Sequence, residues 1–456
     1  MSMTATLRHT LLSFRDLLAT AGPFIVLAVA LLAGAYWLLD PTPPKKVVLA
    51  TGPEQGAYAE FGKRYAEELK KFGITVELRN THGAAENLRL LVDPKAGVDI
   101  AFVQGGAGEG RRAAAAEGTD DGALVSLGSL FHEPVWLFYR ADSAQRLLDA
   151  PALTSLKQLE GWRFNIGARG SGGPNLMLRM IEANAIERGA LTLVRHEQTP
   201  ATMALLAGEV DAMVLVSAPE SLMVQMLLQT PGIQLFSFAQ ADAYARRFPF
   251  LSPVVLPRGV VDLARDVPPQ DVRLVAPTAT LVARDSTHPA LIQLFVQAAD
   301  KIHGGAGWFH KKGDFPSATN TERPLAKEAE RYYKNGPPLL QRYLPFWLAN
   351  LIDRMWPVLV TVIAVLIPLS RMLPPLYEFR VRSRIFRWYG QLRDVEEGIG
   401  TRAPAELLRE LEGIEQRVER VTVPLSYADE LYALRTHIQM VGNRLRASKA
   451  APEAAA

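Results

Sequence analysis

Short apolar runs separate stretches of helical periodicity through the middle of the chain. Runs of branched and aromatic apolar residues predict strands. The predicted strands lie at 47–50, 74–78, 98–103, 124–139, 163–166, 191–195, 210–216, 233–237 and 280–283. Apolar residues spaced by three and four predict helices at 59–72, from Pro174 onward, at 203–208 and at 289–302. Because strands alternate with helices, the pattern predicts an α/β fold with a mainly parallel sheet.

A glycine-rich loop joins the strand at 163–166 to the helix that opens at Pro174. The loop reads Gly167-Ala168-Arg169-Gly170-Ser171-Gly172-Gly173. Its glycines allow sharp turns, and free N–H groups at a helix start favour an anion. The loop has neither a Gly-Lys-Ser/Thr ending nor the dinucleotide glycine spacing, so it is not a nucleotide loop. A plain connection without a ligand is the alternative interpretation.

Other candidate ligand positions follow other predicted strands. The strand at 47–50 leads into Thr51-Gly52-Pro53-Glu54-Gln55-Gly56-Ala57-Tyr58, a second glycine loop before a helix. Gln104 and Ser217 also follow strands. Ligands of parallel α/β sheets bind beyond the carboxyl ends of the strands, so we expect these positions near a ligand.

Two apolar segments predict transmembrane helices, at 21–39 and 355–373. A cleavable signal peptide is the alternative for the first segment. We prefer an uncleaved anchor, because no small-x-small cleavage site precedes the polar segment at Asp40. Trp347 and Trp356 fit an interfacial aromatic belt beside the second segment.

Basic residues predict the orientation of these spans. Arginines precede the first span and follow the second: Arg8, Arg15, Arg371, Arg380, Arg382, Arg384 and Arg387. By the positive-inside rule both termini are cytoplasmic, residues 1–20 included, and the region between the spans lies outside the membrane. The lipid bilayer is therefore one expected partner.

The region 376–456 differs from the rest of the chain. Tyr377–Gly390 mixes arginines with aromatic residues, which predicts a basic amphipathic stretch at the membrane surface. Two apolar seams follow, at 407–421 and 427–445. They predict a cytoplasmic helical hairpin that closes on itself or contacts a partner, such as a second copy of the chain.

Composition and the scatter of polar residues argue against several functions. The formal charge is +3, which does not suggest nucleic acid, and there is no cysteine. We find no catalytic constellation, no metal-ligand spacing and no cofactor motif. The histidines are scattered. For Glu54, Glu86 and Glu133 we prefer capping or surface roles, with a position facing a cleft as the alternative. Arg169 is the side chain we favour for binding a carboxylate, with a solvated loop arginine as the alternative.

Several motifs together resemble a known family. They are Val47–Gly52 with Gly56, Tyr58 and Gly62, then Val98–Gln104, Ser126–Pro134, Gly167–Gly172 and Gly208–Ala212. In this order they resemble the TAXI solute-binding proteins of TRAP transporters, over roughly residues 46–335. The resemblance extends to a membrane-anchored subset with a second span and a basic Arg-Ile-Phe-Arg-Trp-Tyr-Gly tail.

The resemblance implies a two-lobed type II periplasmic-binding fold around a cleft, in the bacterial inner membrane with the binding domain periplasmic. Lobe 1 would comprise 46–136 and 275–335, and lobe 2 would comprise 137–274. The implied partners are a small organic anion (a dicarboxylate, amino acid or 2-oxo acid) and a multi-span TRAP permease. The expected ligand-binding residues are Thr51, Gly52, Gln55, Gly56, Tyr58, Gln104, Arg169, Gly170, Ser171, Gly172 and Ser217.

Two departures from the family pattern concern these loops. The family commonly has a double glycine where this chain has Gln55-Gly56, with an aromatic residue and a proline at Ala59-Glu60, and a proline where Arg169 stands. The usual acid therefore does not carry over directly. The alternative function is a sensor that relays lobe closure through the spans to a cytoplasmic partner.

Overall fold

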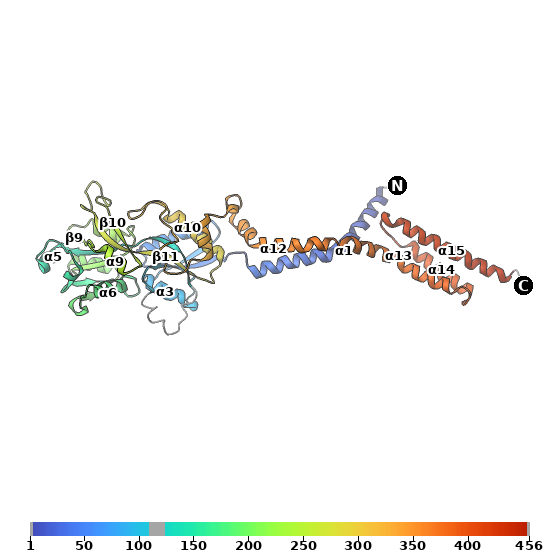
Figure 1. The fold of residues 1–456 in the computed structure, drawn as a ribbon, viewed down its shortest axis with the longest axis horizontal. Helices are drawn as coiled ribbons and strands as arrows, with labels where there is room; N and C mark the ends of the chain where they lie inside the picture. The colour runs from blue at the N-terminus through green and yellow to red at the C-terminus, as the bar shows by residue number, and fades with distance from the viewer. Residues whose placement is uncertain (1–2, 109–123, 454–456) are drawn as a thin grey trace. The chain divides into compact units, whose positions relative to one another are not determined.

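The computed structural model describes residues 3–108 and 124–453, drawn as a ribbon in Figure 1. The chain separates into two compact units. One comprises Thr42–Asn350, and the other comprises Met1–Pro41 with Leu351–Ala456. We call them the α/β unit and the helical unit, and describe each by itself.

The first sheet of the α/β unit has the strand order β10-β11-β3-β1-β2, with β4 also paired to β11. These strands are β1 (Lys46–Ala50), β2 (Thr75–Arg79), β3 (Ile100–Gln104), β4 (Leu124–His132), β10 (Leu251–Leu256) and β11 (Val272–Arg284). β1 pairs in parallel with β2 and β3, in a register that places Val47 opposite Val76. β11 runs antiparallel to β3, β4 and β10.

Four helices accompany this sheet in the described chain: α2 (Ala57–Lys70), α3 (Ala84–Val92), α10 (Pro289–His303) and α11 (Lys327–Asn335). The spacing of apolar residues decides which face of α2 packs inward. Phe61, Tyr65 and Leu69 recur every four residues and are all buried. A stripe of this kind holds a helix against a sheet.

The second sheet has the order β7-β6-β8-β5-β9. Its strands are β5 (Val135–Arg140), β6 (Arg163–Asn165), β7 (Thr192–Val194), β8 (Ala212–Val216) and β9 (Ile233–Leu235). The helices of this region are α5 (Ala141–Leu148), α6 (Gly173–Ala183), α7 (Gln198–Ala207), α8 (Leu222–Leu228) and α9 (Ala241–Arg247). β6 pairs in parallel with β7 and β8, whereas β5 runs antiparallel to β8 and β9.

Two hydrophobic cores divide the α/β unit into lobes. The first lobe is built around Val47–Phe131 and Ala279–Ala329, and the second lobe around Val135–Ala276. The chain passes between them at the β4–β5 connection and again within β11. The α/β fold is confirmed, but each sheet mixes parallel with antiparallel pairs instead of being mainly parallel. The reason is that β5 and β11 carry the chain between the lobes, against the direction of the strand–helix units.

The helical unit contains two helices that are long and apolar enough to cross a membrane by length and composition. These are Leu18–Leu39, within α1 (Met3–Leu39), and α12 (Phe346–Ser370). α1 is one helix through the predicted boundary at residue 20. α12 begins before the predicted start at 355 and ends before 373.

Three further helices of this unit share one hydrophobic core: α13 (Leu373–Glu397), α14 (Pro404–Glu419) and α15 (Ala428–Glu453). The sequence predicted a hairpin from the two seams of α14 and α15. α13 joins them because Val381, Ile385 and Leu392 of its sequence are buried in the same core. The basic stretch is thus one face of a helix whose other face is apolar.

Candidate functional site

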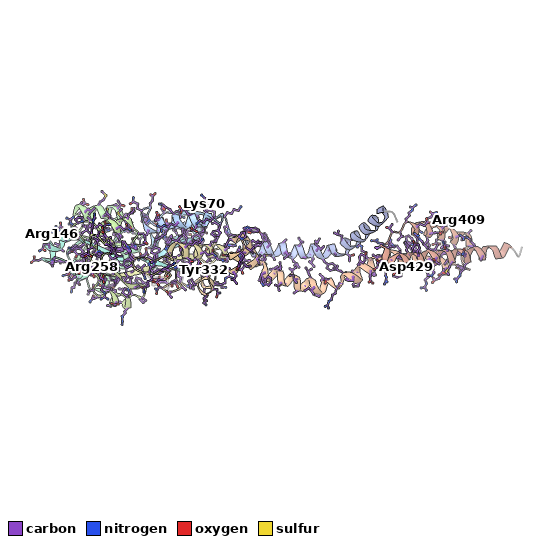
Figure 2. All side chains as sticks on the ribbon, turned by 90° about the horizontal axis from the view of Figure 1, so that it is seen from above. Lys70, Arg146, Arg258, Tyr332, Arg409 and Asp429 are labelled. Carbon is purple, nitrogen blue, oxygen red and sulfur yellow. The ribbon has the colours of Figure 1, made fainter. Side chains whose placement is uncertain are left out.

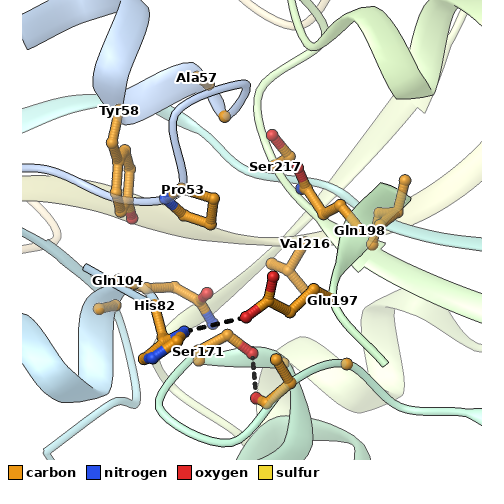
Figure 3. Close-up of a pocket in the computed structure, with 18 of the residues that line it drawn as sticks. Pro53, Ala57, Tyr58, His82, Gln104, Ser171, Glu197, Gln198, Val216 and Ser217 are labelled. Atoms are coloured by element: carbon orange, nitrogen blue, oxygen red, sulfur yellow. Dashed lines mark hydrogen bonds and ion pairs between the residues drawn. The ribbon is translucent and has the colours of Figure 1, made fainter. Parts of the chain in front are cut away.

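A cavity of about 400 Å³ opens where loops of the two lobes face each other. Figure 3 shows side chains from both lobes around it. The lining is made of strand ends and helix starts. It comprises Pro53, Glu54, Gly56–Tyr58, Asn80–Ala84, Glu86, Gln104 and Glu133, together with Asn165–Ala168, Ser171–Gly173, His196–Gln198 and Val214–Ser217. A volume of this size is typical of small-molecule sites in proteins.

Three helices begin at this cavity, and each has a glycine at its N-cap. The N-caps are Gly56 for α2, Gly83 for α3 and Gly172 for α6, and no side chain caps any of the three. The first N–H groups of an α-helix have no partner within the helix. The Glu86 amide of α3 is used by the Gly170 carbonyl, and Pro174 of α6 has no N–H. The three helix starts present the remaining amides of their first turns, and their partial positive charge, to a ligand.

The lobes contact each other across the cavity. Thr199 Oγ1 donates to Gln55 Oε1 at 3.1 Å, and the Glu86 amide donates to the Gly170 carbonyl at 3.1 Å. His82 Nδ1 lies 3.3 Å from Glu197 Oε1, as the dashed line in Figure 3 marks. These contacts describe a cleft with its lobes closed on each other.

The glycine-rich loop at 167–173 can approach Gln104 closely because Gly172 has no side chain. A Cβ at Gly172 would collide with the side-chain amide of Gln104 from the opposite lobe. Gly172 has an ordinary helical φ of −74°, so the requirement for glycine here comes from space and not from backbone conformation. A larger residue at this position would therefore require the Gln104 amide to move.

Glu133 lies between β4 and β5, where the chain first crosses between the lobes. It is 3% exposed, and its Oε2 accepts a hydrogen bond from Tyr58 Oη at 2.7 Å. Burial raises the pKa of Glu133 to about 8, with the Tyr58 hydrogen bond opposing the shift. Tyr58 is itself buried and stacks on Phe102 with 4.9 Å between ring centroids. Burial and the neighbouring Glu133 both raise the pKa of Tyr58.

Asn165, at the end of β6, is a second buried polar group at the cavity. Its Oδ1 accepts a hydrogen bond from the His196 amide at 2.7 Å. Its Nδ2 has no partner among the residues that the structure describes. An unpaired buried donor costs free energy unless a ligand or water satisfies it. Asn165 Nδ2 is therefore a candidate donor to a ligand.

None of the described residues that line the cavity is a lysine or an arginine. Two arginines of the α/β unit that Figure 2 labels are engaged elsewhere. Arg146 pairs with Asp211 at 2.7 Å, and Arg258 pairs with Asp266 at 2.6 Å. Within residues 3–108 and 124–453, no cluster of three or more histidine and acidic side chains could hold a metal ion.

Six of the residues that the sequence singled out line the cavity. They are Gly56, Tyr58, Gln104, Ser171, Gly172 and Ser217. Thr51 and Gly52 lie in the same loop as Gly56 but do not line the cavity. Thr51 is fully buried, and its Oγ1 donates to the Arg79 carbonyl at 3.3 Å. Gln55 contacts Thr199 across the lobes without lining the cavity.

Arg169 and Gly170 differ from the prediction. Neither lines the cavity, and Arg169 is exposed. The Ser171 amide donates to the Ala168 carbonyl at 3.3 Å, which closes a turn with Arg169 at its tip. A side chain at the tip of such a turn faces solvent. Carboxylate binding by Arg169 therefore stays a prediction, with its side chain exposed and outside the cavity lining.

Several lining residues were not among the predicted ligand-binding residues. For Glu54, Glu86 and Glu133 the sequence interpretation preferred capping or surface roles over a position facing a cleft, yet all three line the cavity. The signal that pointed to Glu133 was its position in His-Glu-Pro, at the break between two predicted strands. His82 and His196 line the cavity as well, each just beyond the end of a strand.

Comparison with known proteins gives one family match. The model of the NMT1-like family matches residues 49–336, which span both lobes. No curated protein sequence matches this chain.

Solved structures resemble the chain only distantly. The alkanesulfonate-binding protein SsuA from Xanthomonas axonopodis pv. citri, bound to MOPS, is 14% identical over 57% of this chain and 73% of its own, with a TM-score of 0.37. The aliphatic sulphonate binding protein SsuA from Escherichia coli is 14% identical over 70% of this chain and 83% of its own, with a TM-score of 0.37. PhnD1 from Prochlorococcus marinus, in complex with methylphosphonate, is 11% identical over 57% of this chain and 83% of its own, also with a TM-score of 0.37. At TM-scores this low, the ligands of these three proteins give no information about the ligand of this chain.

Proposed function

This chain belongs to the NMT1-like family, and from that membership and the cleft geometry we propose that it is a solute-binding protein that closes its two lobes on a small organic anion. The observation that carries the proposal is the meeting of three helix starts with glycine N-caps at one cavity. Their free amides bind a carboxylate without a basic side chain. Gln104, Ser217 and Asn165 then contact the rest of the solute through neutral hydrogen bonds.

The proposal includes a membrane tether and a transport partner. The two apolar helices of the helical unit support anchoring in the bacterial inner membrane, with the α/β unit on the outer side. The resemblance of its loops to TAXI proteins supports delivery of the solute to a multi-span TRAP-type permease. The lobes would close in the periplasm, release the solute to the permease and reopen.

A second candidate function is a sensor. The observation that favours it is the folded core of α13, α14 and α15, which a simple receptor does not need. In this version lobe closure changes how that core contacts a cytoplasmic partner.

A substitution at Gly172 tests solute binding on the full-length chain in detergent. The methyl group of Gly172→Ala must displace the Gln104 amide from its place at the cavity. Calorimetry with the solute identified from a panel of amino acids, 2-oxo acids and dicarboxylates should show affinity about tenfold lower, equivalent to about 1.4 kcal/mol. Gly189→Ala is the matched control, because a Cβ at Gly189 meets nothing within 4 Å. Equal affinities for both variants would place the solute elsewhere.

A further inference from the structure

Glu133 lines the cavity and lies in the β4–β5 connection, where the chain passes from the first lobe to the second. Its backbone amide donates to the Pro277 carbonyl of β11 at 2.9 Å, which joins the two segments that pass between the lobes. Its Oε2 is satisfied by Tyr58, while no described residue donates to its Oε1. A buried carboxyl with one free oxygen at a cavity wall is available to a ligand.

The charges around the cavity are acidic. Its lining includes Glu54, Glu86, Glu133 and Glu197 but, among the described residues, no lysine or arginine. His82 is adjacent to Glu197, and the Glu86 carboxylate accepts a hydrogen bond from the His82 amide at 2.8 Å. The Glu86 carboxylate also pairs with Arg89, which lies outside the lining, at 3.6 Å. A solute with two carboxylates would therefore place its second negative charge near Glu54 and Glu197, with no lysine or arginine among the described lining residues. Like charges at this range oppose binding.

We propose that the solute is a zwitterion of the amino-acid class. Its carboxylate binds the free amides at the starts of α3 and α6, and its ammonium group pairs with Glu133. This inference rests on the proposed function and narrows it, since a dicarboxylate or a 2-oxo acid would lack the group that Glu133 recognises.

A proton balance follows from this pairing. In the unoccupied cleft Glu133 holds a proton at neutral pH because burial raises its pKa to about 8. An ammonium group favours the carboxylate form, so the proton leaves when the solute binds. The titratable group in contact with Glu133 is Tyr58 of α2, and His132 of β4 is its neighbour in the chain. The other titratable groups that line the cavity are Glu54, His82, Glu86, His196 and Glu197.

Calorimetry on the full-length chain in detergent tests the inference with matched probes. L-Alanine, L-leucine and L-glutamine are compared with pyruvate, 4-methyl-2-oxopentanoate and succinate at pH 7. We expect at least one amino acid to bind, with its 2-oxo counterpart and succinate at least about tenfold weaker. Repeating the titration in buffers of different ionisation enthalpy should reveal release of a proton.

Glu133→Gln removes the charge while keeping the shape of the side chain. It should weaken amino-acid binding by at least about tenfold, whereas the exposed Glu187→Gln, outside the cavity, should leave it unchanged. If Glu133→Gln does not fold, the buffer experiment on the unsubstituted chain still decides whether Glu133 releases its proton to the buffer when the ammonium group binds.

Three results would contradict the inference. Binding of succinate or a 2-oxo acid in preference to every amino acid would refute the zwitterion but keep the solute-binding function. Amino-acid binding without proton release and with unchanged affinity in Glu133→Gln would assign Glu133 a neutral role. If no probe produces heat or raises the melting temperature, both the zwitterion and the proposed small organic anion fall.

Discussion

Two buried carboxylates in this chain have opposite surroundings. Asp211, just before β8 in the second lobe, accepts hydrogen bonds at 2.7–3.0 Å from Ser143, Arg146 and both the backbone and guanidinium of Arg163. Glu133, at the cleft, accepts one from Tyr58. Both are about 2–3% exposed, but they differ in the number of donors that their carboxyl oxygens contact.

The donors set the charge of each group. Burial opposes ionisation of Asp211, but the hydrogen bonds from Arg163 outweigh it and lower its pKa to about 2. Burial dominates at Glu133 and raises its pKa to about 8. A buried carboxylate with several donors stabilises the fold, whereas a buried carboxyl with few donors at a cavity is a candidate for ligand binding. Asp211 belongs to the Gly208–Ala212 motif of the family resemblance, which therefore marks a structural ion pair and not a part of the cavity.

The largest expected effect is on the structural side of this comparison. Asp211→Asn should lower the free energy of unfolding by about 3 kcal/mol, the lower end of the range for a broken buried pair. The lower end applies because Arg146 and Arg163 are half exposed and regain water. Chemical denaturation of the full-length chain measures the change.

The control for this change is Asp266→Asn, which breaks the exposed pair with Arg258. We expect a much smaller loss there, because exposed ion pairs contribute little. Equal losses in the two variants would show that burial does not strengthen the Asp211 pair.

The two carboxylates also predict opposite pH dependences. Asp211 ionises more readily in the folded chain, so its contribution to stability is present above its ordinary pKa of 3.8 and is lost as the pH falls toward 2. Glu133 keeps its proton when folded but loses it when unfolded above pH 4.5. Its folded form therefore loses stability as the pH rises from about 4.5 to 8.

Glu133→Gln measures this second contribution. The amide does not titrate, so the variant should be more stable than the parent at pH 8 by on the order of 2 kcal/mol, and nearly equal to it at pH 4.5. Melting curves of both proteins across this range give the difference. A difference that does not change with pH would mean that Glu133 is ionised in the folded cleft.

Local and non-local features explain which parts could be predicted from the sequence. The strands, helices and glycine loops depend on neighbouring residues, and Gly56, Ser171 and Gly172 line the cavity as expected. A position of Glu133 at the cleft was only the less favoured interpretation, because its burial requires two distant segments to meet, as its hydrogen bond to Pro277 shows. The mixed direction of the sheets was missed for the same reason. The spacing of residues along the chain shows neither which distant segments pack together nor which way paired strands run.

The smallest expected effect concerns Arg169, whose charge lies neither in a buried ion pair, as at Asp211, nor in a buried cavity wall, as at Glu133. It is exposed and lies outside the cavity, unlike the buried Asp211 and Glu133. Solvent screens such a charge, so Arg169→Ala and Arg169→Lys should each change solute affinity by less than about threefold, roughly 0.6 kcal/mol. Titration of both variants with the bound amino acid, beside Glu133→Gln, measures the contrast. A loss of more than about tenfold in Arg169→Ala, with only partial recovery in Arg169→Lys, would mean that the turn at Arg169 rearranges when the solute binds and that its guanidinium pairs with the carboxylate after all.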